Sequence, residues 1–211
     1  MSITSVDIVN GALAKFGEAA ILSLDDGSYA GRLASREYDR KRQALTRMHR
    51  WNFATKRAVL APLSTAPLFG NTYQFQLPAD YLRLIGLYDA QDEFNDRCYT
   101  SGRIPYRVEG GKLLCDYNPV YVIYTADITD PDLMDPLYIV ALEWFLAVTF
   151  VVPLTNSSAK QGSVQNGFMA AMKEAKAANA IETESEVVVA GDWVDSRFVG
   201  NVPHGWSSGI Y

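Results

Sequence analysis

The sequence predicts an α+β fold: mainly a helical bundle of four helices, with an inserted small antiparallel β domain and an extended C-terminal tail. Three patterns predict it. Apolar residues recur every three or four positions in residues 1–57 and 127–181, as on one face of a helix. Residues 58–126 instead alternate apolar with polar side chains between Pro and Gly breaks, as short strands do. Residues 182–211 have no regular period, so we expect an extended tail there.

The first two helices are predicted from their caps and apolar stripes. Thr4 or Ser5 can cap the first helix, and the acid Asp7 lies in its first turn. Gly17 ends this helix. Ser28 can cap a second helix that runs to about Trp51. The expected core stripes are Val6, Val9, Leu13 and Phe16 in the first helix, and Ala30, Ala34, Tyr38, Lys41, Leu45 and Met48 in the second.

The β domain is expected to be one small antiparallel sheet. Pro78-Ala79-Asp80 makes a corner between two strands, and Gly110-Gly111 is a hairpin turn. Residues 89–97 are polar and predict an exposed loop. The predicted strands are residues 73–77, 82–88, 106–109, 112–116 and 120–126.

Two further helices follow. Asp135 can cap the third helix with Pro136 in its first position, and Pro153 is expected to close it. Residues 137–152 are apolar nearly all round, and a helix of that length spans about 24 Å, less than the roughly 30 Å core of a bilayer. We therefore expect a central buried helix of a soluble protein. The fourth helix should start at Ser157 or Ser158 and fade near Ala180, with a stripe of Val164, Phe168, Met172 and Ala175.

The composition limits the class of protein. The chain has 211 residues, 48% of them apolar, which is enough for one good-sized domain with a core. A net charge of −5 argues against a generic basic nucleic-acid-binding domain. Nine Phe, twelve Tyr and four Trp favour contact surface. The N-terminus has no secretion signal, and Cys98 and Cys115 are interpreted as reduced cytosolic thiols that could be neighbours in a sheet.

Several common catalytic motifs are absent from the sequence. It contains no Walker loop, GxGxxG, HExxH or Cys/His cluster, and its two histidines are His49 and His204. We therefore expect no enzyme activity, no cofactor and no metal. The closely spaced acids lack the Gly and Glu of an EF-hand loop, so turns and helix caps explain them better than calcium; they are Asp127, Asp130, Asp132 and Asp135.

A glycosidase needs two carboxylates about 5 to 9.5 Å apart, one with a raised pKa. Glu18, or Glu143 in the apolar helix, could supply the raised pKa by burial, but the sequence identifies no partner carboxylate. Glu143 is interpreted as a carboxylate of helix packing or of a subunit interface, paired with an arginine.

Basic residues concentrate on the second helix. Residues 28–57 carry nine Lys or Arg against two acids, a net charge of +7, whereas residues 182–211 have a net charge of −4. Arg side chains recur at helical spacing on the face opposite Tyr38, and such a stripe is either a solvated face or a face that binds carboxylates or phosphates. The stripe consists of Arg32, Arg36, Arg40, Arg47 and Arg50.

Over residues 5–182 the order of elements resembles the podovirus tail tubular protein A family of head-to-tail adaptors. The segments that carry the resemblance are MHRWNFATKRAVLAP, YQFQLPADYLRLIGLYD, VIYTADITDPDLMDPLYIVALEWFLAVTFVVPLT and the helix ending KEAKAANA. The resemblance implies a structural ring of twelve identical subunits in the virion, assembled in the host cytoplasm. It also implies a portal protein and a tail nozzle protein as partners, with tail fibres as a further one. Double-stranded DNA would pass through the channel without specific binding during ejection, and no membrane is involved.

On this reading, Arg32, Arg36, Arg40 and Arg47 are expected to contact acids of an adjacent subunit or of the portal, in preference to DNA. The tail is expected to be ordered by assembly, because its spaced aromatics suit anchors that fill a partner's pockets. The interface candidates outside the stripe are Glu143, Trp193, Arg197, Phe198, Trp206 and Tyr211.

Two alternatives stay open. The first is a virion-associated peptidoglycan hydrolase, which would need a pair of carboxylates in a cleft. The second is a DNA-packaging protein that binds duplex through the Arg stripe.

Overall fold

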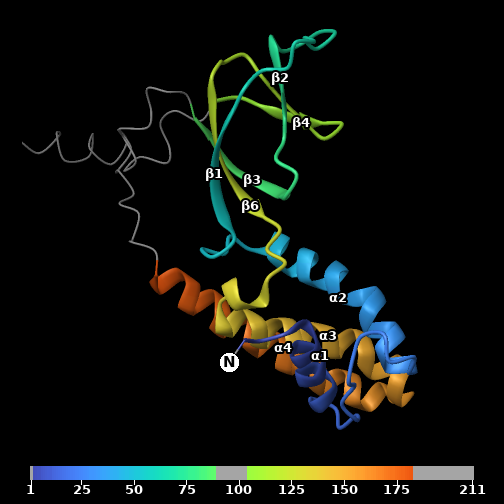
Figure 1. The fold of residues 1–211 in the computed structure, drawn as a ribbon. Helices are drawn as coiled ribbons and strands as arrows, with labels where there is room; N and C mark the ends of the chain where they lie inside the picture. Colours follow the sequence, from blue (N-terminus) through green and yellow to red (C-terminus); the bar gives the residue numbers. More distant parts are fainter. Residues whose placement is uncertain (1, 89–103, 183–211) are drawn as a thin grey trace, which may run out of the picture.

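The computed structural model describes residues 2–88 and 104–182. In these residues four α-helices lie at one end of the molecule and two three-stranded antiparallel sheets at the other (Figure 1). The mixed helix-and-strand class is therefore confirmed. The expected bundle is matched only loosely, because the helices differ in length and the second runs from the helical end to the sheets (Figure 1). The predicted tail, residues 182–211, lies outside the described residues beyond Glu182.

The first helix, α1 (Ser5–Ala14), follows its predicted start. Thr4 is the N-cap: its hydroxyl accepts a hydrogen bond from the Asp7 amide at 3.2 Å, and the Asp7 carboxylate accepts from the Thr4 amide at 2.9 Å. This reciprocal pair satisfies two amides that the first turn leaves without partners. Gly17 follows with a φ of +80°, a left-handed conformation suited to glycine.

The second helix, α2 (Tyr29–Met48), starts after its predicted cap, Ser28, but ends earlier than expected. The backbone is extended at His49, and the indole of Trp51 turns back to donate a hydrogen bond to the carbonyl of Leu45 at 3.2 Å. Trp51 therefore caps the last turn from outside the helix. The predicted stripe is correct for Ala34, Tyr38 and Leu45 and wrong for Met48, which is exposed.

The third helix, α3 (Pro136–Thr155), is central: α1, α2 and α4 (Ser158–Ile181) all contact it. The predicted cap is confirmed, since the Asp135 carboxylate accepts hydrogen bonds from the amides of Leu137 and Tyr138 at 2.8 and 3.0 Å. The predicted end at Pro153 is wrong. A proline so near the C-terminus removes only one intrahelical bond, and the left-handed Asn156 ends the helix instead.

This later end changes the length argument for α3. With 20 residues the helix spans about 30 Å, and by length and composition alone it could cross a bilayer. A single helix of this kind is weak evidence for a membrane span, since the core helix of a soluble protein has the same length and composition. Eight of its side chains are buried within the fold, among them Leu142, Leu146 and Phe150.

The predicted start and apolar stripe of α4 are confirmed, with Val164, Met172 and Ala175 buried and Phe168 packed against the core.

The strands form two sheets, whereas the sequence predicted one. The first has the order β1-β6-β3 and the second β2-β5-β4, all antiparallel. Gly110 and Gly111, at φ +56° and +75°, make the predicted hairpin turn between β4 and β5. The first strand was missed, because its charged residues gave no alternation and its position is fixed by pairing with β6. The strands are β1 (Thr55–Leu60), β2 (Tyr73–Gln76), β3 (Tyr81–Tyr88), β4 (Arg107–Glu109), β5 (Lys112–Cys115) and β6 (Val120–Ala126).

Two glycines of α4 provide a matched test of its packing. A Cβ atom at Gly167 would lie 2.5 Å from the ring of Trp144 on α3, whereas one at Gly162 would meet nothing within 4 Å. We expect Gly162→Ala to stabilise the protein by about 0.5–1 kcal/mol, because alanine loses less backbone entropy in a helix. Gly167→Ala should destabilise it by about 1–3 kcal/mol, because the ring must move within a packed interface. Urea unfolding measures both, and equal effects of the two substitutions would contradict this packing.

Candidate functional site

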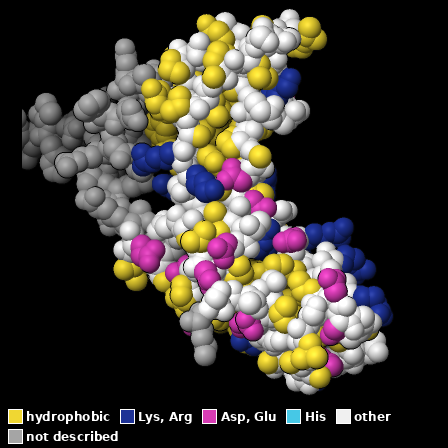
Figure 2. Space-filling model, in the orientation of Figure 1, with side chains coloured by type: hydrophobic (Ala, Val, Ile, Leu, Met, Phe, Trp, Pro, Cys, Tyr) yellow, Lys and Arg dark blue, Asp and Glu magenta, His cyan; other side chains and the backbone are white. Residues whose placement is uncertain are grey.

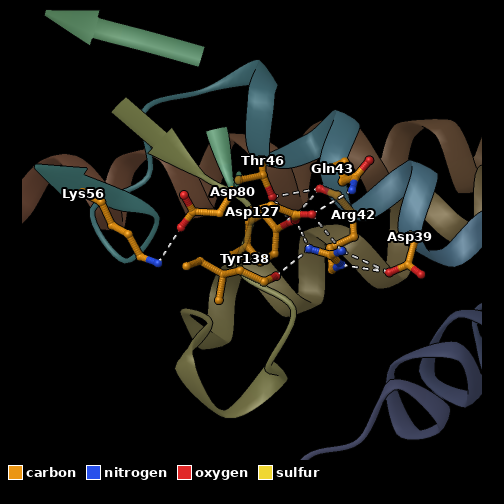
Figure 3. A network of polar contacts seen from close by, with 9 residues as sticks. Asp39, Arg42, Gln43, Thr46, Lys56, Asp80, Asp127 and Tyr138 are labelled. Carbon is orange, nitrogen blue, oxygen red and sulfur yellow. Dashed lines mark hydrogen bonds and ion pairs between the residues drawn. The ribbon is translucent and has the colours of Figure 1, made fainter. Parts of the chain in front are cut away.

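Helix α2 carries two groups of side chains with different surroundings. One group, at the helix–sheet junction, reaches the end of β6 and the start of α3. We define the junction as Arg42, Gln43, Thr46, Asp127 and Tyr138, which Figure 3 shows converging. The other group, the basic face of α2, is defined as Arg32, Arg36 and Arg40.

The junction is built on Arg42, whose side chain is only 2% exposed. Its guanidinium pairs with the Asp127 carboxylate and donates to the carbonyl of Ile128 at 2.6 Å and to Asp39 at 3.0 Å (Figure 3). Gln43 donates to the other oxygen of Asp127 at 2.7 Å. A buried cation needs such partners, because an unpaired charge in the interior costs several kcal/mol. Arg42 therefore holds α2 to the segment that follows β6.

Two hydroxyls complete the junction from α2 and α3. Tyr138 donates to the backbone carbonyl of Arg42 at 3.0 Å, and its hydroxyl lies 2.7 Å from that of Thr46. The ring of Tyr138 packs edge-on against Trp51 and Phe53, with centroids 5.1 and 4.8 Å away. Helix α3 is thus tied to α2 and to the segment that leads into β1 at one point.

A second set of contacts lies beside the junction on the sheet side. Arg47 donates to the carbonyl of Leu82 in β3, and Arg83 donates back to the carbonyl of Arg47 at 3.2 Å. This exchange fixes the C-terminal turn of α2 to β3, so the predicted stripe residue Arg47 has a partner within its own chain.

Asp80 joins β1 to β6 at the same end of the first sheet. It accepts from Lys56 at 2.8 Å and from the Tyr124 hydroxyl at 3.0 Å. Burial alone would raise the pKa of Asp80, but these hydrogen bonds lower it below its ordinary value. Burial, followed by the hydrogen bond to Asp80 and its charge, raises the pKa of Tyr124 to about 12.

The pKa of Arg42 reflects the same balance. Burial alone would lower it, yet hydrogen bonds from the guanidinium to Asp127 and Asp39, together with their charges, raise it above its ordinary value. Arg42 is therefore charged at neutral pH.

The basic face of α2 differs from the junction in exposure. Arg36 and Arg40 are 64% and 72% exposed and share one acid, Glu37, at 3.0 and 3.8 Å. Arg32 donates to the carbonyl of Gly27 at the start of the helix. Figure 2 shows Lys and Arg side chains along the outer edge of the helical end, where α2 runs. Two cations on one shared acid leave a net positive surface.

The predicted stripe is therefore divided by the structure. Arg32, Arg36 and Arg40 lie on the outer face of α2, and Arg47 is tied to β3. Arg50 lies beyond the end of the helix and is not on this face; its carbonyl accepts from Asn179 at 3.0 Å.

Glu143 packs within the helices. Its carboxylate forms an ion pair with Lys15 at 2.9 Å and fills the space above Gly11 of α1. Glu143 is thus a carboxylate of helix packing, and its partner is a lysine instead of the expected arginine. The other interface candidates, Trp193, Arg197, Phe198, Trp206 and Tyr211, lie outside the described residues, as do Cys98 and His204.

The closely spaced acids of residues 127–135, which the sequence offered as a calcium candidate, have structural roles. Asp130 caps the short 3₁₀ turn Pro131–Leu133, and Asp132 accepts from Ser2 and Ile3 near the N-terminus. Asp135 caps α3, and Asp127 belongs to the junction. In residues 2–88 and 104–182 no group of three or more His, Cys, Asp or Glu is arranged to hold a metal ion.

Two of the hollows on the described surface bear on the search for paired carboxylates. One, of about 380 Å³, lies between the β1–β2 loop and the β4–β5 hairpin, and its lining includes one acid, Glu109. The other, of about 330 Å³, lies at the start of α2 and includes Asp25 with Arg32 and Arg36. Neither brings two carboxylates together.

His49 and Cys115 occupy buried or half-buried positions. The ring of His49 packs edge-on against Trp51 at 5.0 Å; burial, then the charges of Lys176 and Arg83, lower its pKa. The Cys115 thiol is buried in β5, and burial raises its pKa. These surroundings are those of packing residues.

Sequence reasoning missed the junction. Arg42 was counted only in the net charge, and Thr46 and Tyr138 were not singled out. The available signal was an arginine about 200° from Arg40, on the apolar side of the helix, together with an aspartate directly after a buried strand.

No protein-family model matches this chain, and comparison with curated proteins gives no match.

The junction predicts an asymmetric effect of removing its two charges. Asp127→Ala strands Arg42, which is buried, and should destabilise the protein by about 3–5 kcal/mol. Arg42→Met leaves Asp127 with Gln43 and some access to water, and should cost less. Asp39→Ala is the comparison: it removes a partner of Arg42 that is 72% exposed, while Asp127 and Ile128 remain, so a smaller loss of about 1 kcal/mol is expected. Urea unfolding gives the three values, and a larger loss for Arg42→Met would contradict the geometry.

The raised pKa of Tyr124 predicts a loss of stability at high pH. The folded protein holds this proton more tightly than the unfolded chain, whose tyrosine pKa is about 10. The resulting stabilisation is complete below pH 10 and is lost as the pH rises through about 12. Tyr124→Phe should lose less stability than the wild type over this window, measured by thermal unfolding. Tyr121→Phe, on the same strand, should behave as the wild type does; an unchanged slope in Tyr124→Phe would exclude this proton.

Proposed function

We propose that this chain is a structural head-to-tail adaptor of a tailed bacteriophage. Identical subunits form a ring between the portal and the tail nozzle, and DNA passes through its channel. The finer features of the proposal are a four-helix bundle in each subunit, a dodecameric ring and contact with tail fibres. The protein acts in the virion as an assembly component and carries no enzyme activity.

One observation carries the proposal: the segments that resemble the adaptor family meet in space. Trp51 of the first segment packs against Tyr138 of the third. Lys56 of the first segment and Tyr124 of the third both bind Asp80 of the second. Residues up to 87 positions apart in the sequence thus form one framework between helices and sheets. Contacts among all three segments support a real relationship to the adaptor family over a chance similarity of residue pattern.

The junction supports a role in assembly. A closed ring requires each copy to present its contact surfaces at one fixed angle to its neighbours. Arg42 and Arg47 tie α2 to the segment after β6 and to β3 through hydrogen bonds. Those bonds restrict rotation of the sheets about the end of α2.

The basic face of α2 suits carboxylate partners on an adjacent subunit or on the portal. Arg36 and Arg40 are exposed and have one acid between them, and a guanidinium fork matches a carboxylate. Phosphate contact is less compatible with a conduit. Each neutralised phosphate adds about 0.9 to the log–log salt slope of binding, so many copies together would clamp the duplex.

No observation on the described residues favours the hydrolase alternative. Glu143 is committed to Lys15, and Glu18 lies on an exposed loop. The proposal is tested by measuring the mass of the protein alone and mixed with a portal ring, by native mass spectrometry and electron microscopy. A closed ring in either condition is expected, and a strict monomer in both refutes it.

The basic face yields a direct prediction. Arg36→Glu with Arg40→Glu should abolish ring assembly, because both charges that meet the partner's acids are reversed. The melting temperature of the isolated subunit should stay within a few degrees, since both side chains are exposed. A matched control is Arg57→Glu on β1 with Lys173→Glu on α4, both exposed, which should assemble normally. If the α2 variant assembles but loses retention or ejection of DNA, the face lines the channel and the assignment is wrong.

A further inference from the structure

The basic face of α2 carries its charges at a regular interval. Its three exposed arginines follow one another every four residues, which is about 6 Å along the helix axis and within about 80° around it. Two acids of the same helix lie near them. Glu37 is shared by two of the arginines, and Asp39 accepts hydrogen bonds from the buried Arg42. The face therefore presents a row of cations with charge left for another molecule.

Three acids repeat at a similar interval where α4 ends. Glu182, Glu184 and Glu186 alternate with uncharged residues, and we call these three the acidic row. In an extended chain, alternate side chains lie on one face, about 6.6 Å apart. Residues 182–195 contain five acids and no Lys or Arg, so their own segment does not neutralise the row.

The two repeats match in spacing and in chemistry. They differ by about 0.6 Å per step, which the long side chain of arginine can absorb. A guanidinium binds a carboxylate through two parallel hydrogen bonds, and an ammonium group does not. An extended acidic segment laid along α2 therefore gives each arginine of the basic face one carboxylate.

The acidic row cannot lie along the basic face of its own chain. Asn179 of α4 accepts from the amide of Asn52 at 2.8 Å, so α4 ends near the C-terminal end of α2. Arg36 lies 12 residues before Met48, about 18 Å back along α2. Glu186 is four residues beyond Glu182 and reaches at most about 14 Å from it. The end of α4 and the start of α2 also lie at opposite ends of the helical part (Figure 1). The matching face belongs to a second copy.

The surface beside the arginines is hollowed at the start of α2. The hollow has a volume of about 330 Å³, and Leu24 and Ser35 line it together with Arg32 and Arg36. A segment seated there shields part of the contact from water, which strengthens ion pairs that are weak when fully exposed. A ring repeats the same row of pairs at every subunit boundary.

We propose that the acidic row of one copy binds the basic face of α2 in the next copy. The contact joins two different surfaces of the chain, so it is heterologous and closes into a ring when the rotation permits. This inference rests on the proposed ring, and it names the carboxylates that the basic face meets there.

Charge reversal on each side tests the contact. The tail variant is Glu184→Arg with Glu186→Arg, and the face variant is Arg36→Glu with Arg40→Glu. The matched control is Asp192→Arg with Asp195→Arg, the same change of charge in the same segment. Its two positions are three residues apart, so an extended chain places them on opposite faces. Native mass spectrometry, alone and with a portal ring, gives the assembly state, and all variants should keep the wild-type unfolding midpoint within a few degrees.

The tail variant and the face variant should each fail to assemble, and the control should assemble as the wild type does. Mixed in equal amounts, the two variants should form rings in which they alternate. The reversed tail of one then meets the reversed face of the other, and the two unchanged surfaces also meet.

Three results overturn the inference and leave the ring proposal standing. They are a tail variant that assembles normally, a control that fails as the tail variant does, and a mixture that stays monomeric. The last of these is also the result expected if the acidic row binds the portal. A wild type that is monomeric in both conditions refutes the ring proposal, and the inference fails with it.

Discussion

The desolvated guanidinium of Arg42 is the constraint on which the arrangement of helices and sheets depends. A charge that is 2% exposed needs acceptors in the directions of its N–H groups. Those acceptors come from Asp39 on its own helix and from Asp127 and Ile128 just after β6. The end of the central strand of the first sheet is thereby fixed against the middle of α2.

The helical period then separates two functions on one element. Residues 40 and 42 point about 200° apart, so an arginine that faces the junction leaves its neighbour in water. Arg36 and Arg40 stay exposed with only Glu37 between them, which gives α2 an unneutralised outer face. One helix therefore provides both the internal attachment of the sheets and an external basic surface. This combination suits a subunit whose neighbours must meet it at a set angle.

The sheets place an exposed apolar surface at the other end of the molecule. The β1–β2 loop leaves the first sheet and returns into the second, and Leu68 at its uncharged tip is 98% exposed. A basic face on the helices and an apolar tip on the sheets are distinct in chemistry and in position (Figure 2).

The sequence by itself determined the local structure wherever side chains act on their own backbone. Thr4, Ser28, Asp135 and Ser157 were identifiable as caps because capping is a contact within three residues, and Gly110-Gly111 as a turn because only glycine adopts its φ readily. The central position of α3 followed from an apolar surface that needs cover on all sides. Tertiary structure alone decided the division into two sheets, the strand β1 and the early end of α2 at Met48. It also decided which arginine is buried: Arg42 and Arg40 are the same residue type two positions apart, and only the arrival of Asp127, 85 residues away, gives one of them the partners that burial requires.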